Sequence, residues 1–275
     1  MENSDSSYRL VWFQHLHKAA GSSIVNQAIA NGEILFPNHK NGNPCSSDGS
    51  FLPIWNYDRE TLTEFIDQCE VNGITFIATE WGSPNFGVLS EDSRVFLMTC
   101  LREPWRRLVS NYNYDYYFGH SRKRTLIEYF SENHRIGMDN HLVRIYSRMC
   151  DADESEFDDL SVSVSLSNLK LFNLVLVVER IGDLDVILFE VLGWENKHVD
   201  SYSTFGNMWA LVGLLREFRL LTAMQYLLRM KRNLSSGDRE YFERLSGLEI
   251  EFYKKVIEAG VSRPKRPSSS DGSVR

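Results

Sequence analysis

The chain has 275 residues, of which 43% are hydrophobic and 12% aromatic, so it can bury the core of one large α/β domain. Its 30 basic and 37 acidic residues give a formal net charge of −7, which does not favour binding to nucleic acid or to an anionic membrane. The first residues are polar, and no apolar run approaches the roughly 18 to 20 residues of a membrane helix, so we expect a cytoplasmic protein without a signal peptide.

The first half of the chain predicts strands that alternate with helices. An apolar run over residues 8–16 predicts a strand, and a Lys/Gly/Ser turn leads from it into a helix over 23–30. Residues 38–50 are dense in Asn, Gly, Pro and Ser, which predicts a surface loop that flanks an acceptor site. The further elements expected here are a helix over 57–69, strands over 73–78 and 94–101, and helices over 104–117, 125–130 and 140–148.

The second half continues this pattern. The acidic stretch 151–159 predicts a solvated linker or helix cap, a strand is expected over 174–178, and helices are expected over 184–192, 209–230 and 238–259. Strands separated by helices indicate a single α/β domain over 8–260 with a central, mostly parallel sheet flanked by helices. Residues 1–7 and the Pro/Ser-rich residues 261–275 are expected to be disordered.

The four cysteines show no metal or redox spacing. They are far apart in the chain and form no CxxC pair: Cys45, Cys69, Cys100 and Cys150. We therefore expect free thiols in a reducing compartment and no metal site.

The first motif that carries chemistry is HLHKAAGSSI over residues 15–24, where a predicted strand gives way to a helix. A helix N-terminus offers unpaired N–H groups and positive dipole character, and Lys18, Gly21 and the adjacent hydroxyls complete an anion site. A helix start capped by Ser22 or Ser23 would also explain these residues. A Mg-dependent nucleotide site is disfavoured, because Lys18 precedes Gly21 whereas GxxxxGK[ST] requires the reverse order.

The second motif is VFLMTCLREPWRRLVSN over residues 95–111. Pro104 favours a first helical turn, so Arg102 is expected at the carboxyl end of a strand and Ser110 about two turns along the helix. Ligands bind at such strand ends in open α/β sheets, and an Arg fork with a Ser hydroxyl suits a phosphate. The structural alternative is a helix-capping salt bridge between Arg102 and Glu103.

Together these motifs resemble those of sulfotransferases that use 3′-phosphoadenosine 5′-phosphosulfate (PAPS), in the carbohydrate and heparan-sulfate-type branch. FQHLHKAAGSS over 13–23 is similar to the family's 5′-phosphosulfate loop, FxHxxKxxGTS, and LREPWRRLVSNY over 101–112 to its 3′-phosphate motif, LRDPxxRxxSxY. Weaker similarities are DNHLVR over 139–144 and VVERIGDLDVILFEVLGW over 177–194. The departures are His17 for Pro, Ala19 and Ala20 for Thr and Gly, and Glu103 for Asp.

The resemblance, over residues 8–260, implies a P-loop-like sulfotransferase fold. It also implies transfer of a sulfuryl group from PAPS to a hydroxyl or amine of a carbohydrate or small-molecule acceptor, with 3′-phosphoadenosine 5′-phosphate as product and no required metal. Lys18 would stabilise the leaving group. The loop residues that would cradle the 5′-phosphate are Ala20, Gly21, Ser22 and Ser23, and those that would hold the 3′-phosphate are Arg102 and Ser110.

The acceptor proton requires a base, which the family often places just after the next strand. Glu80 occupies that position here, and His17 is the rival. The residues expected to line the acceptor site are Trp81, Asn85, Phe86, Asn140 and Arg144, although Trp81 and Phe86 equally suit a core and Arg144 an ion pair. The basic residues Arg216, Arg219, Arg229, Lys231 and Arg232 are interpreted as a solvated helix face.

Two other functions remain open at this stage. A nucleotide or small-molecule kinase with a degenerate P-loop would require a Gly-rich loop and a Mg-binding carboxylate, and neither is evident. A catalytically inactive PAPS- or glycan-binding module would keep donor binding without a base, and Glu80 argues against it.

Overall fold

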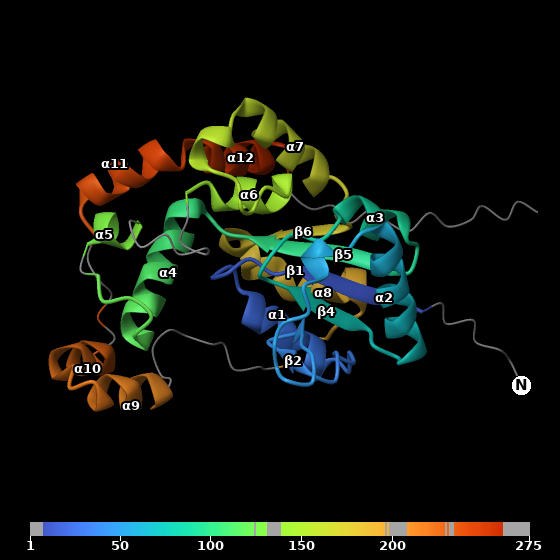
Figure 1. Cartoon of the computed structure of the whole chain (residues 1–275), viewed down its shortest axis with the longest axis horizontal. Coiled ribbons are helices and arrows are strands. Elements are labelled where there is room, and N and C mark those ends of the chain that lie inside the picture. The colour runs from blue at the N-terminus through green and yellow to red at the C-terminus, as the bar shows by residue number, and fades with distance from the viewer. Residues whose placement is uncertain are drawn as a thin grey trace, which may run out of the picture.

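The computed structural model describes residues 8–123, 125–130, 139–195, 197, 208–228, 230 and 234–260. The termini expected to be disordered, 1–7 and 261–275, lie outside the described residues. A central sheet of four parallel strands has the order β4-β1-β5-β6 (Figure 1). The strands are β1 (Leu10–Gln14), β4 (Phe76–Thr79), β5 (Val95–Leu101) and β6 (Leu174–Val177). The expected α/β class, with a parallel sheet flanked by helices, is confirmed.

Both faces of the sheet are buried, which explains why its strands are apolar without alternation. All five residues of β1 are buried. Successive side chains point to opposite faces, so Val11 and Phe13 enter one core and Leu10 and Trp12 the other. In register, Phe13 lies between Ala78 of β4 and Met98 of β5.

Helices cover each face. The face of Val11 packs against α1 (Gly21–Ala30) and α8 (Leu184–Leu192). The opposite face packs against α2 (Arg59–Val71), α6 (His141–Ser147) and α12 (Gly247–Glu258). Of these, α6 and α12 lie above the sheet in Figure 1.

The remaining helices extend this arrangement. In Figure 1, α4 (Pro104–Phe118) leaves the carboxyl end of β5 and runs away from the sheet towards α9 and α10. The other α-helices are α3 (Phe86–Glu91), α5 (Leu126–Phe130), α7 (Asp159–Leu169), α9 (Met208–Arg216), α10 (Leu220–Leu227) and α11 (Ser236–Leu245). Three short 3-10 helices are η1 (Ile54–Asn56), η2 (Glu154–Glu156) and η3 (Val178–Asp183), and a small antiparallel hairpin joins β2 (His39–Lys40) to β3 (Asn43–Pro44).

Several sequence predictions are corrected. The helix predicted over 209–230 is two helices, interrupted where Phe218 has a φ of 56°, and the one predicted over 238–259 is interrupted at Ser246. The helix α7 was not predicted, because its apolar residues alternate with serines as in a strand. The side chain of Asp158 caps α7 by accepting from the Ser161 N–H at 3.0 Å, and the helix packs on α6 and α12.

The thiols of Cys45, Cys69 and Cys100 are free and buried, as expected. Cys150 Sγ lies 3.2 Å from Ser83 Oγ. In the part of the chain that the structure describes, no helix combines the length and apolarity needed to cross a membrane.

Candidate functional site

The order of the strands indicates a candidate ligand site between β1 and β5. The chain forms β1 first and then adds β4 on one side of it. The next two strands, β5 and β6, are added on the other side of β1, so the strand order reverses between β1 and β5. Open parallel sheets bind ligands at the carboxyl ends of strands on either side of such a switch point. The loops after β1 and β5 meet there, where Arg102 Nη1 donates a hydrogen bond to the Lys18 carbonyl at 2.9 Å. The two sequence motifs, 84 residues apart, are therefore in direct contact.

The turn from β1 to α1 has an unusual backbone. Lys18 and Ala20 have φ values of 64° and 61°, in the left-handed region that costs a non-glycine residue about 1–2 kcal/mol. The Ala20 carbonyl accepts from the N–H groups of Ser23 and Ile24, both at 3.1 Å. No acceptor among the described residues faces the N–H groups of Gly21 and Ser22. Left-handed turns with unpaired N–H groups are typical of anion-binding loops.

The start of α1 also corrects an alternative reading of this motif. The helix begins at Gly21, and its N-cap is Ala20, which makes no side-chain capping bond. The hydroxyls of Ser22 and Ser23 therefore do not cap α1. Both serines are half-buried within the first turn, and Ser22 Oγ accepts from Asn41 Nδ2 at 3.2 Å.

Gly21 is required by a close approach to His15. A Cβ at Gly21 would lie 1.7 Å from His15 Nε2. The His15 ring is 4% exposed and stacks on Phe13, with ring centroids 5.5 Å apart. Burial lowers the pKa of His15, so the imidazole is neutral at pH 7. His15 thus packs at the end of β1, directly against the first residue of α1.

Lys18, within this turn, directs its ammonium towards α4. Its Nζ lies 4.1 Å from the centroid of the Tyr114 ring on α4. Burial lowers the pKa of Lys18 to about 8; Arg102 acts in the same direction, whereas Asp115 and Glu80 oppose it. The lysine is therefore still mostly protonated at pH 7, but poorly solvated, which strengthens its attraction for an anion.

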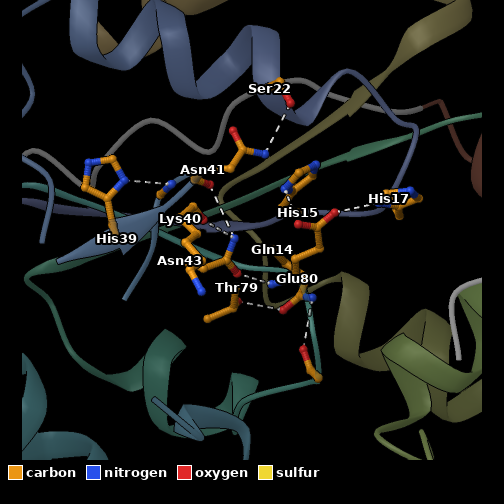
Figure 2. A network of polar contacts seen from close by, with 12 residues as sticks. Gln14, His15, His17, Ser22, His39, Lys40, Asn41, Asn43, Thr79 and Glu80 are labelled. Atoms are coloured by element: carbon orange, nitrogen blue, oxygen red, sulfur yellow. Dashed lines mark hydrogen bonds and ion pairs between the residues drawn. The ribbon is translucent and has the colours of Figure 1, made fainter. Parts of the chain in front are cut away.

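Glu80 forms the second part of the site. It directly follows β4, and its side chain is 9% exposed. Glu80 Oε1 lies 2.8 Å from His17 Nδ1, and Oε2 lies 3.5 Å from His15 Nδ1; both rings face the carboxylate in Figure 2. Burial raises the pKa of the Glu80 carboxyl, whereas the two histidines and the Lys18 ammonium lower it, and the net pKa is about 2. The carboxylate is therefore ionised at neutral pH.

The hairpin β2–β3 links Glu80 to the turn before α1. The backbone N–H of Glu80 donates to Asn43 Oδ1 at 2.8 Å (Figure 2). The Ala78 N–H donates to the Gly42 carbonyl at 3.0 Å. The loop expected over 38–50 thus contains a hairpin beside Glu80. The sequence feature that indicates this hairpin is Asn41–Gly42, a common two-residue hairpin turn. Both residues have a positive φ.

Arg102 retains an unused donor. Its side chain is half-buried, and its Nε is buried without an acceptor among the described residues. The expected alternative, a capping bridge to Glu103, is not formed, because the Glu103 carboxylate itself caps α4 by accepting from the N–H groups of Trp105 and Arg106. Ser110 is half-buried on α4, and within the described residues no hydrogen bond joins it to Arg102.

Four of the five residues expected to line the acceptor site have partners within the fold. Asn85 caps α3 by accepting from the Val88 N–H at 3.3 Å. Phe86 is completely buried, with its ring centroid 5.1 Å from that of Phe172. Asn140 donates to the Leu245 carbonyl at 3.2 Å and accepts from the Glu249 N–H at 3.1 Å, and the buried Arg144 pairs with Asp139 at 3.0 Å.

Trp81, the fifth, is next to Glu80 in the chain. Its ring centroid lies 5.4 Å from that of Phe51, and its Nε1 is buried without a partner in the described part of the chain. Of the predicted basic helix face, Arg216 is exposed and Arg219 half-buried, whereas Arg229, Lys231 and Arg232 lie outside the described residues.

Comparisons of this chain with protein-family models and with curated proteins find no match. The chemistry of the site must therefore be argued from its own groups. These are a left-handed turn that contains Lys18, an arginine at the same switch point whose Nε has no acceptor among the described residues, and an ionised carboxylate that contacts a histidine.

Proposed function

We propose that the protein is a PAPS-dependent sulfotransferase with a P-loop-like sulfotransferase fold. In this proposal it transfers a sulfuryl group to a hydroxyl or amine of a carbohydrate or small molecule. The observation that supports this best is the contact between Arg102 and the Lys18 carbonyl, which joins two cationic loops at the switch point of the sheet. A donor with phosphates at both ends of one ribose requires two such anion sites close together.

The unpaired groups of the site fit such a donor. The N–H groups of Gly21 and Ser22, at the positive end of α1, and the Lys18 ammonium would bind the 5′-phosphosulfate. The buried Nε of Arg102, which has no acceptor among the described residues, would donate to the 3′-phosphate, and Ser110 would add a hydroxyl from α4. Binding the ligand would therefore satisfy buried donors that the protein alone leaves unpaired.

The proton of the acceptor would pass to the pair formed by His17 and Glu80. A carboxylate with a pKa of about 2 is a weak base, so the geometry favours His17 as the group that accepts the proton. When His17 Nδ1–H donates to Glu80, the lone pair of Nε2 is available, and the carboxylate holds the tautomer and stabilises the imidazolium.

The transfer would then balance as follows. The acceptor oxygen or nitrogen forms a bond to sulfur, and the bond between sulfur and the bridging oxygen breaks. The proton goes to His17 Nε2, and 3′-phosphoadenosine 5′-phosphate leaves with the bridging electrons, which Lys18 stabilises.

Thermal unfolding with nucleotides tests the donor site directly. We expect 3′-phosphoadenosine 5′-phosphate to raise the unfolding free energy by about 2.7 kcal/mol at 100 times its Kd, and AMP or MgATP at the same concentration to do much less. Equal stabilisation by AMP would remove the 3′-phosphate role of Arg102, and selective stabilisation by MgATP would favour a kinase. A screen of acceptors with labelled PAPS then distinguishes a transferase from an inactive binding module.

A further inference from the structure

The helices α9 and α10 carry apolar residues both on the side that packs against the protein and on the side that faces solvent. Its inner side packs on α4, where Leu214, Ala223 and Tyr226 contact the cluster that contains Tyr116 and Tyr117. A surface helix normally turns polar residues outward. The residues exposed on this pair are instead mostly large and apolar: Met208, Leu215, Phe218, Leu220, Leu221, Met224, Leu227, with Leu228 and Met230 directly after α10.

This outer side, which we call the α9–α10 apolar face, is extensive. Phe218, in the turn between the helices, is 87% exposed, Leu221 is 75% exposed and Met208 is 72% exposed. Single exposed apolar residues are ordinary, but a run of them over two adjoining helices marks an interaction surface.

Positive charges adjoin the face. Arg216 ends α9 and is exposed, and Arg122, in the loop after α4, reaches Glu217 in the turn between the helices. Arg219 is the N-cap residue of α10, and its guanidinium lies against Tyr116 of α4, on the inner side of the pair. The single acidic residue of the turn, Glu217, is paired with Arg122 Nη2 at 3.0 Å. The local charge is therefore opposite in sign to that of the whole chain.

We propose that the α9–α10 apolar face binds the surface of an anionic phospholipid membrane. An apolar side with aromatic and aliphatic residues, flanked by Arg216 and Arg122, fits the boundary between headgroups and acyl chains. With 9 and 8 residues, the helices are too short to span a bilayer, so the pair would lie in the interface. A symmetric contact between two copies would bring the same basic residues together, which disfavours self-association. The inference is independent of the proposed enzymatic function.

Vesicle sedimentation tests this inference. We expect the protein to sediment with vesicles that contain phosphatidylserine roughly tenfold more than with phosphatidylcholine alone, and less so as salt rises. The double variant Phe218→Glu, Leu221→Glu should lose binding yet remain folded by circular dichroism, because both side chains are solvent-exposed. Val71→Glu, at an 86% exposed position on α2, is the matched control and should bind as the wild type does.

Two results would overturn the proposal. One is that the double variant sediments with anionic vesicles as well as the wild type does. The other is that the wild type binds no vesicles but forms a concentration-dependent dimer in sedimentation velocity that the double variant abolishes, which would assign the face to a second copy of the chain. Neither result depends on whether PAPS binds.

Discussion

Replacing Glu80 by Gln removes the negative charge at the centre of the site while keeping its size. Burial raises the pKa of this carboxyl, but the hydrogen bond with His17, the Lys18 ammonium and the histidines in their protonated form lower it by more, from 4.5 to about 2 on folding. A shift of this size corresponds to roughly 3 kcal/mol of native-state stabilisation of the charged form. Because the folded pKa is depressed, that stabilisation is present above about pH 4.5 and is lost as the pH falls through 2.

Urea unfolding of the wild type and of Glu80→Gln between pH 7 and pH 3 measures this contribution of the Glu80 charge to the free energy of unfolding. We expect the difference in unfolding free energy between the two proteins to be largest at pH 7 and to shrink by roughly half of the 3 kcal/mol by pH 3. The exposed Glu91, which pairs with Arg59, supplies the control, since Glu91→Gln should change stability little at any pH. A difference that stays constant from pH 7 to pH 3 would refute the electrostatic role of Glu80.

The same variant separates the two candidate bases. We expect Glu80→Gln to lower turnover by roughly 10² to 10⁴-fold with nucleotide affinity near that of the wild type. If His17 accepts the proton, His17→Gln should lower turnover over the same range while nucleotide affinity stays near that of the wild type. If His17→Gln is fully active, His17 is not the base.

Three further predictions concern Gly21, Lys18 and Arg102. Gly21→Ala should destabilise the protein by roughly 1–3 kcal/mol, and adding His15→Ala should recover part of the loss; Gly213→Ala, whose Cβ meets no atom within 4 Å, should not destabilise. The affinity for 3′-phosphoadenosine 5′-phosphate, measured by calorimetry, should fall as the pH rises through about 8, where Lys18 loses its proton, and Lys18→Arg should be insensitive over that range. Arg102→Lys should weaken this nucleotide by roughly 10 to 100-fold while AMP affinity changes little; equal losses for both nucleotides would remove Arg102 from the 3′-phosphate site.

The sequence alone determined the local elements around the two motifs. The apolar runs that became β1 and β5 are buried on both faces, and Pro104 begins α4 as expected. The helix predicted over 184–192 has the bounds of α8. Such features depend on short-range patterns of apolar residues and on the fixed φ of proline, so they can be read without knowing what the segments pack against.

The tertiary structure decided which distant residues meet. Glu80 was selected for its position after a strand, but only the pairing of β4 with β1 brings it within 2.8 Å of His17, 63 residues away. Phe86 and Arg144 have residue types that suit an acceptor site, yet long-range packing buries both. Burial, and with it the pKa of each ionisable group, is set by neighbours that come from remote parts of the chain, which is why local pattern could propose the groups of this site but not their charge states or partners.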